Sequence, residues 1–237
     1  MAGTAGAHEH TAQVWWAKPR DATPALESFL DDIERRRWTA YRRDEDRQRF
    51  LVGCALVKAA VASREGGPAR DVTLDRTCTE CGEPHGKPVV KGSAIELSIS
   101  HSGDRIVVAV AYRTPLGVDV EQVREPGGDD PDALARYVLA DQELAAVRTP
   151  QDFMTAWTRK EAVTKATGDG LRVSFREVVL SPPAEPPRLI AWPYPASPRT
   201  VSLFDLDAGP GYKAALAVIG RCAAVSTGDG TTLLRAA

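Results

Sequence analysis

Apolar residues recur with two different periods along this chain, and the change of period predicts where its helices and strands lie. From Asp44 onward they stand three or four positions apart, which is typical of an amphipathic helix that ends near Gly66. From Ile95 they alternate with polar residues, which is typical of a half-buried strand. These patterns, with their caps and turns, predict helices at 24–37, 44–66, 133–147 and 150–168, and strands at 95–101, 105–112, 116–121, 175–180, 200–206 and 212–219.

Two segments with similar texture close the two parts of the chain, at 104–110 and 211–218. Both are rich in alanine and branched apolar residues, as expected of buried strands. This similarity indicates two related α+β halves.

The composition is that of a globular protein, with 43% hydrophobic and 26% charged residues among 237. The net charge of −2 argues against a generic nucleic-acid binder, which needs a broad excess of Lys and Arg. No apolar run approaches the roughly 20 residues that span a bilayer, and the N-terminus lacks the pattern of a signal peptide. We therefore expect a cytoplasmic protein with neither a nucleic-acid nor a membrane partner.

The cysteines are too few and too scattered for a disulfide scaffold, so we expect reduced thiols. Cys78 and Cys81 form a Cys-x-x-Cys motif, which with His85 invites a zinc interpretation. Structural zinc takes four ligands, and the chain has no second such motif. A local turn leading into Gly86-Lys87-Pro88 is therefore favoured.

Two carboxylates stand two positions apart on the strand predicted at 116–121. Asp119 and Glu121 project from one face, roughly 7 Å apart at Cα, while Val118 and Val120 point to the other face. Carboxylates crowded on one side repel each other unless they are solvated or bridged by a cation, and oxygen ligands suit magnesium. The alternative is an ordinary solvated strand end.

The helix predicted at 150–168 carries an acid and a base on one face. Phe153, Trp157, Glu161 and Lys165 are each four positions apart, so they stack along the helix. An ordinary Glu–Lys pair beside a buried aromatic anchor explains this spacing. The functional interpretation makes Glu161 a third magnesium ligand and Lys165 a point charge for phosphate oxygens.

Three short motifs, taken together, resemble the phosphopantetheinyl transferase superfamily. Each motif alone is widespread, but their order and spacing, preceded by Gly86-Lys87-Pro88, match the larger, monomeric Sfp-like branch of that family. The resemblance covers roughly residues 35–170. The motifs are Ser100-His101-Ser102, Gly117-Val118-Asp119-Val120-Glu121 and Trp157-Thr158-Arg159-Lys160-Glu161-Ala162-Val163-Thr164-Lys165.

This resemblance implies an α+β fold with two similar halves related by a pseudo-two-fold axis, and coenzyme A in the cleft between them. We expect the halves at 13–113 and 114–222, with mobile tails at 1–12 and 223–237, in a monomeric protein. The implied activity is magnesium-dependent transfer of 4'-phosphopantetheine from coenzyme A to a serine of an apo acyl or peptidyl carrier protein. Such carriers serve fatty-acid, polyketide or nonribosomal-peptide synthesis, and adenosine 3',5'-bisphosphate is released.

The resemblance also assigns the acidic residues. Asp119, Glu121 and Glu161 would hold Mg²⁺, with Mn²⁺ as the alternative, against the coenzyme A pyrophosphate. Glu161 would assist removal of the serine proton and Lys165 would stabilise the leaving phosphate. With His101, these two form the predicted catalytic set.

Other residues would bind the nucleotide. By the resemblance, His101 and Ser100 would contact the coenzyme A phosphates, and Lys87 of the segment Gly86-Lys87-Pro88 would reach the nucleotide end. Residues 34–49 include seven arginines against four acids, a local charge of +3 that favours a small anionic ligand. Within that segment, Arg37 and Arg49 fall where family members bind the ribose phosphate and adenosine.

Two other classes of protein stay open at this point. Asp and Glu ligands followed by a lysine also build metal-dependent nucleases, although the negative net charge weakens that interpretation. The third class is a non-catalytic module that binds coenzyme A, or zinc through the Cys-x-x-Cys motif. The intact set of acids argues against a decayed site.

Overall fold

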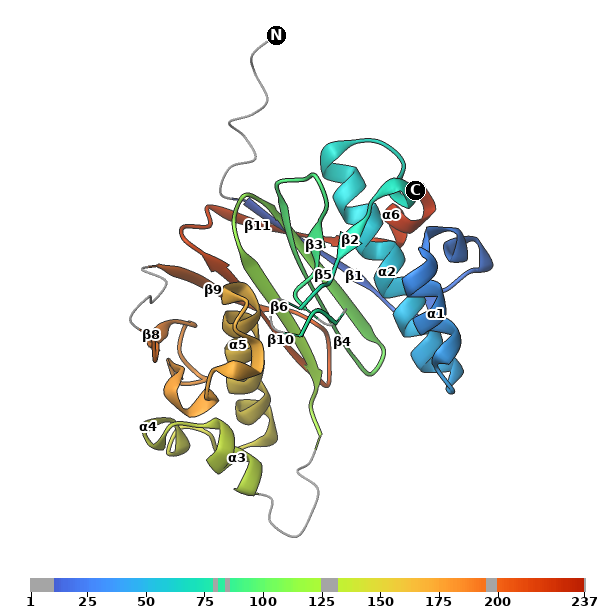
Figure 1. Ribbon diagram of the computed structural model, residues 1–237. Coiled ribbons are helices and arrows are strands. Elements are labelled where there is room, and N and C mark those ends of the chain that lie inside the picture. Colours follow the sequence, from blue (N-terminus) through green and yellow to red (C-terminus); the bar gives the residue numbers. More distant parts are fainter. Residues whose placement is uncertain (1–10, 79–80, 84–85, 125–131, 195–199, 237) are drawn as a thin grey trace. The chain divides into compact units, whose positions relative to one another are not determined.

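The computed structural model describes residues 11–78, 81–83, 86–124, 132–194 and 200–236 (Figure 1). The chain forms two compact units, Met1–Thr114 with Ala223–Ala237, and Pro115–Cys222. Each unit is a sheet with one long helix packed against it, and each follows the same chain order: a strand, helices, and a two-stranded hairpin. The predicted α+β fold with two similar halves is confirmed.

Unit 1 is built on a four-stranded sheet in the order β11-β1-β5-β4, in which β1 pairs antiparallel with β5 and parallel with β11. A separate short hairpin, β2–β3, follows the long helix in the sequence and precedes the β4–β5 hairpin of the sheet. The strands are β1 (Thr11–Ala17), β2 (Leu74–Asp75), β3 (Val89–Val90), β4 (Ile95–Ser102), β5 (Arg105–Tyr112) and β11 (Ala224–Asp229). The helices are α1 (Asp32–Ala40), α2 (Asp44–Glu65) and α6 (Gly230–Ala236), with 3-10 turns at Pro19–Asp21, Pro24–Phe29 and Ala69–Asp71.

The core of unit 1 forms around α2. Three acids in its first turn favour the start of the helix through their charge. Gly66 ends the helix, because glycine readily adopts the φ of 81° found there. Residues 51–61 are all buried, and they pack on the sheet side chains Ile106, Val108 and Val110. The predicted helix at 44–66 is therefore correct, and the structure places it centrally.

Unit 2 is built on a three-stranded antiparallel sheet in the order β6-β10-β9, against which α5 packs. Its strands are β6 (Leu116–Gln122), β7 (Val179–Leu180), β8 (Leu189–Ala191), β9 (Val201–Leu206) and β10 (Tyr212–Ile219). Its helices are α3 (Asp132–Val138), α4 (Asp141–Leu144) and α5 (Pro150–Thr167), with 3-10 turns at Gly170–Arg172 and Phe175–Glu177. Thr149 caps α5 by accepting the Asp152 N–H, and Gly168 ends it in the left-handed region.

The single helix predicted at 24–37 is wrong. The chain forms a 3-10 turn at Pro24–Phe29, becomes extended at Leu30 and restarts as α1. Asp31 causes the restart, because its side chain accepts the Glu34 N–H while the Glu34 carboxylate accepts the Asp31 N–H.

Two predictions in the second half also change. The helix expected at 133–147 is broken into α3 and α4, because the Glu143 side chain accepts the Ala140 N–H and starts a new helix there. The strand expected at 175–180 is a 3-10 turn followed by the short β7. That turn supplies two backbone carbonyls to a buried lysine, described below.

The mobile tail expected at 223–237 is also wrong for the part that the structure describes. Residues 224–236 form β11 and α6, and both belong to unit 1. Strand β11 is mostly exposed and is held by parallel backbone pairing with β1. Its side chains therefore do not alternate between apolar and polar, which is the pattern that predicts a strand from the sequence. Of the tail expected at 1–12, residues 1–10 lie outside the described residues, and Thr11 already belongs to β1.

Candidate active site

A glycine brings strand β6 against helix α5. A Cβ added to Gly117 would lie 2.2 Å from the Ala162 carbonyl oxygen and 2.4 Å from the Ala166 nitrogen. Gly117 therefore allows strand backbone to touch helix backbone. Asp119 and Glu121 follow it at two-residue intervals, so they lie on the face of β6 that α5 covers. This role of Gly117 was not predicted from the sequence, although the residue stands at the start of the acidic motif.

Asp119 meets Lys165 across this contact. Asp119 is 2% exposed, and its Oδ1 accepts a hydrogen bond from the Lys165 ammonium at 2.6 Å. Lys165 also donates to the Val118 carbonyl at 3.3 Å and keeps part of its side chain in solvent. The predicted acid on the strand and the predicted base on the helix thus meet in one ion pair.

Glu161 lies one helical turn before Lys165 and is half-buried. Burial raises the pKa of its carboxyl above the usual value. The charge of Lys165 opposes that increase in the pKa, while the carboxylates of Asp119 and Glu121 add to it. Asp119 and Glu121 are therefore close enough to influence Glu161, which holds its proton more tightly than an exposed glutamate.

The donor chemistry of these three acids fits a hard divalent cation such as Mg²⁺, because all are carboxylates on facing surfaces of one strand and one helix. A bound cation would also offset the burial and the neighbouring carboxylate charges that raise the pKa of Glu161. Across the described residues, however, no three His, Cys, Asp or Glu side chains converge closely enough to form a ready metal cluster. In this arrangement the Lys165 ammonium pairs with Asp119.

The predicted serine and histidine lie at the end of β4, in unit 1. Ser100 is buried and His101 is exposed, as expected for neighbours on opposite faces of a strand. His101 stands opposite Ile106 in the hairpin with β5.

Lys87 lies just before β3, in the return arm of the β2–β3 hairpin. Gly86 has no room for a Cβ, which would lie 2.9 Å from the Thr77 carbonyl oxygen. The Lys87 ammonium is 3.8 Å from the Glu96 carboxylate. Burial lowers the pKa of Lys87, and Glu96 opposes that decrease. Pro88 completes the predicted segment and is half-buried.

The two predicted arginines have different surroundings. Arg37 is exposed, and its guanidinium lies 5.5 Å from the ring centre of Phe50. Arg49 donates to the Gly103 carbonyl from Nε at 3.1 Å and from Nη2 at 2.9 Å, and pairs with Asp46 and Glu45. Arg49 thereby supports the turn that follows His101.

Two backbone hydrogen bonds join the described residues around the Cys-x-x-Cys motif. The Gly82 N–H donates to the Cys78 carbonyl at 3.0 Å, and the Cys78 N–H donates to the Glu83 carbonyl at 2.8 Å. His85, the third residue of the zinc alternative, lies outside the described residues. Neither Cys78 nor Cys81 is in a disulfide.

Comparison with known proteins gives two family matches, one on each unit. Residues 115–217 match the model of the 4'-phosphopantetheinyl transferase superfamily, and residues 13–113 match that of the 4'-phosphopantetheinyl transferase N-terminal region. The chain belongs to the 4'-phosphopantetheinyl transferase superfamily. It is an enzyme of the phosphopantetheinyl transferase type, and coenzyme A is the substrate that this superfamily uses.

Similar proteins from bacteria cover both units. The 4'-phosphopantetheinyl transferase HetI of Nostoc is 28% identical over 214 residues, which is 86% of this chain and 84% of that protein. The 4'-phosphopantetheinyl transferase psf-1 of Bacillus pumilus is 25% identical over 81% of this chain and 79% of its own length. The 4'-phosphopantetheinyl transferase Sfp of Bacillus subtilis is 25% identical over 80% and 82%. The resemblance inferred from three motifs thus extends over most of the chain.

Among the helices that the structure describes, none combines the length and apolar character needed to cross a membrane.

Proposed function

We propose that this phosphopantetheinyl transferase moves the 4'-phosphopantetheine group of coenzyme A to a serine of an apo acyl or peptidyl carrier protein, with Mg²⁺ and with release of adenosine 3',5'-bisphosphate. The observation that carries the proposal is the 2.6 Å contact between the Asp119 carboxylate of β6 and the Lys165 ammonium of α5, one helical turn from Glu161. Acids and a lysine that influence each other in this way are what phosphoryl-type transfer requires.

In the proposed reaction, the carrier serine oxygen forms a bond to the β-phosphorus of coenzyme A. The bond from that phosphorus to the bridging pyrophosphate oxygen breaks, and the electron pair leaves with adenosine 3',5'-bisphosphate. Glu161 assists removal of the serine proton, because its position beside the proposed metal site places it at the reacting centre. The Lys165 ammonium stabilises the charge that grows on the leaving phosphate.

Asp119, Glu121 and Glu161 are the residues that would hold the metal ion. When bound, Mg²⁺ supplies charge neutralisation for the pyrophosphate. Asp119 has a second role, because its ion pair with Lys165 keeps the ammonium beside the acids. Exchange of Asp119 between Lys165 and the ion would leave the ammonium available to phosphate.

Residues of unit 1 would bind the nucleotide part of coenzyme A. We assign His101 and Ser100 to its phosphates, and Lys87 in the Gly86-Lys87-Pro88 segment to the nucleotide end. Arg37 is the exposed arginine of the proposed set. Arg49 already supports the Gly103 turn, so its contribution to nucleotide binding would combine direct contact with support of the strand end that carries His101.

The test is a direct assay of transfer. The purified chain is incubated with coenzyme A, Mg²⁺ and apo acyl or peptidyl carrier proteins, and each carrier is weighed by intact-mass spectrometry. A mass gain of one phosphopantetheinyl group, lost when the metal is chelated or the carrier serine is replaced by alanine, supports the proposal. No gain on any of several carriers of both types would overturn it.

A further inference from the structure

Helix α5 sends two consecutive cations into the interior of unit 2, immediately before Glu161. Arg159 is 1% exposed and Lys160 is 0% exposed. Neither has a role in the proposed reaction. Cations are rarely buried so completely unless specific partners compensate for the lost hydration, so the partners of both side chains indicate what the burial achieves.

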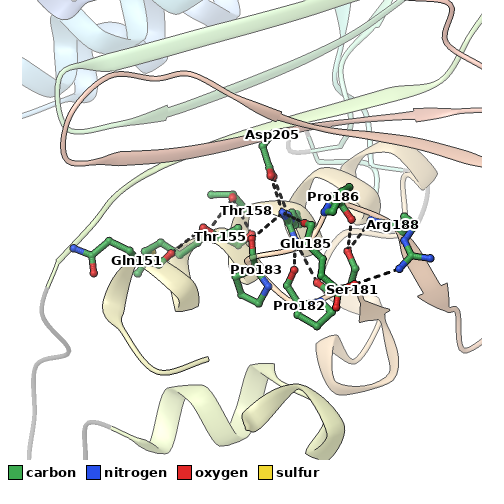
Figure 2. Close-up of polar contacts among 12 residues, drawn as sticks. Gln151, Thr155, Thr158, Ser181, Pro182, Pro183, Glu185, Pro186, Arg188 and Asp205 are labelled. Carbon is green, nitrogen blue, oxygen red and sulfur yellow. Dashed lines mark hydrogen bonds and ion pairs between the residues drawn. The ribbon is translucent and has the colours of Figure 1, made fainter. Parts of the chain in front are cut away.

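Arg159 holds a proline-rich loop and strand β9. Its guanidinium donates to the carbonyls of Ser181, Pro182, Pro183 and Glu185 at 3.1 to 3.3 Å. It also pairs with Asp205 through two hydrogen bonds of 2.8 and 2.6 Å. Figure 2 shows the loop residues Ser181, Pro182, Pro183 and Glu185 close to one another, with Asp205 on the neighbouring strand. One side chain thus fixes the helix to two other segments.

Lys160 forms a second anchor. Its ammonium donates to the backbone carbonyls of Val138, Phe175 and Val178 at 3.1, 2.7 and 2.7 Å. It pairs with Glu143 at 2.5 Å, and the other Glu143 oxygen accepts the Leu180 N–H at 2.9 Å. Lys160 therefore ties α5 to the end of α3, to α4 and to the turn before β7.

The close packing of α5 on β6 at Gly117 is one of several contacts that can set the rotation of the helix. At Gly117 the strand presents bare backbone to the helix, and the small side chains Ala162 and Ala166 fill the surrounding space. Packing of this kind is non-directional, and the Lys165–Asp119 ion pair adds a directional contact on this side of the helix. The hydrogen bonds of Arg159 and Lys160 add directional contacts on its other sides. Each residue turns the helix by about 100°, so Lys160 and Arg159 anchor directions about 100° and 200° away from Glu161.

We propose that Arg159 and Lys160 are positioning residues, which set the rotation of α5 so that Glu161 and Lys165 face Asp119 and Glu121. The proposal rests on the function proposed above, because it concerns the alignment of that site. In the Arg159-Lys160-Glu161 sequence, the first two residues thus anchor the helix and the third acts on the substrate. Seven backbone carbonyls and two carboxylates accept hydrogen bonds from the two anchors.

The test compares two matched double variants. Lys160→Met with Glu143→Leu removes the anchor in unit 2, and Lys58→Met with Glu34→Leu removes the buried Lys–Glu pair of α2 in unit 1, which has a 2.8 Å contact. Apolar replacement of a buried ion pair often leaves stability unchanged. Misplacing a catalytic group by about 1 Å can lower the rate about 100-fold. We therefore expect kcat for carrier modification to fall about 10-fold to 100-fold in the first variant and to stay within about two-fold in the second.

A second measurement keeps this test independent of transfer. Mn²⁺ titration in the presence of coenzyme A should show about ten-fold weaker metal binding in the first double variant, because Glu161 is misaligned, and unchanged binding in the second. If the wild type modifies no carrier but Mn²⁺ still binds more weakly to the first double variant than to the second, the proposed function fails and the positioning role stands. Wild-type kcat and wild-type Mn²⁺ affinity in a folded first variant would overturn the positioning role.

Two further variants exclude a purely structural effect and guard against misfolding. Glu143→Leu alone leaves Lys160 buried without its carboxylate and should lower the thermal midpoint, which adding Lys160→Met should restore without restoring kcat. Arg159→Lys keeps the charge but loses the fork that reaches four carbonyls. It should lower kcat at least about three-fold with little change in KM for coenzyme A. Recovery of kcat together with stability would show that the anchors only stabilise the fold.

Discussion

The long helices of the two units share one buried device. In α2, Lys58 donates to the Phe29 carbonyl at 2.6 Å and pairs with Glu34. In α5, Lys160 donates to backbone carbonyls and pairs with Glu143. Both glutamates occupy the third position of a short preceding helix and accept the N–H at its start. A buried Lys–Glu pair at the same point of both halves indicates that it belongs to the shared scaffold.

The chemistry differs at the positions that follow. One residue after the buried lysine stands Ala59 in α2 and Glu161 in α5, and five residues after it stand Ser63 and Lys165. The same scaffold therefore carries an acid and a base in one unit and small side chains in the other.

The first strands of the two sheets show the same division. Ala17 pairs with Ile106, the second residue of β5, and Glu121 pairs with Lys213, the second residue of β10, so the two strands can be aligned. The helix-facing positions that correspond are Gln13, Trp15 and Ala17 in β1, and Gly117, Asp119 and Glu121 in β6. Two similar halves thus supply one set of acids, and the following predictions test this division.

The largest effect is expected from the acids that unit 1 lacks. Glu161→Ala and Asp119→Ala should each lower kcat by about 1,000-fold or more, because both remove charge that stabilises the transferred phosphoryl group. Transfer is measured by carrier mass, and circular dichroism should be that of the wild type. Full activity in either variant would remove that residue from the metal site.

Gly117→Ala should give the next largest effect, on stability. A Cβ there would lie 2.2 Å from α5 backbone that cannot rotate away, so we expect the free energy of unfolding to fall by about 3 kcal/mol. The matched change in unit 1, Gln13→Ala, should lower it by less than about 1 kcal/mol. Urea denaturation measures both. A loss below about 1 kcal/mol in Gly117→Ala would mean that the strand–helix contact accommodates a Cβ.

Lys165 and Ser63 form the third matched pair. Lys165→Met should lower kcat about 100-fold, because it removes the cation beside Asp119 that would meet the leaving phosphate. Ser63 donates only to the Ala60 carbonyl within its own helix, so Ser63→Ala should leave kcat within about two-fold. A similar loss in both variants would show that the two helix ends contribute alike.

Features set by neighbouring residues, such as helix ends and the face of a strand, could be predicted from the sequence. Features set by contacts between residues far apart in the chain could not. The helix at 44–66 was predictable because acids at its start and a glycine at its end act within one turn. Asp119 and Glu121 were predictable because a two-residue interval places side chains on one face in any strand. The break at Asp31 was missed because the capping exchange with Glu34 competes with an otherwise helical pattern.

The scaffold of the site was not predictable for a different reason. The partners of Lys160 and Arg159 are mostly backbone carbonyls, 15 to 26 residues away along the chain, and any residue type supplies a carbonyl. Strand β11 escaped prediction for the same reason, since backbone pairing with β1 holds it. Where side-chain chemistry defines a feature, the sequence displays it; where backbone groups define it, only the structure does.

The smallest effect concerns the charge of Glu161 itself. Its pKa is raised above the ordinary 4.5, so the folded protein disfavours the ionised form relative to the unfolded chain. Below pH 4.5 the carboxyl is protonated in both states and the penalty vanishes; as the pH rises past the folded pKa, the full penalty develops.

Glu161→Gln should therefore raise the thermal midpoint by about 1–3 °C at pH 7 without divalent cations, and by less as the pH falls towards 4.5. Saturating Mg²⁺ should reduce or reverse this difference, because only the wild type gains a ligand for the ion. If the difference in thermal midpoint changed with neither pH nor Mg²⁺, the charge of Glu161 would not interact with those of Asp119 and Glu121. The contrast between the two units would then rest on Lys165 alone.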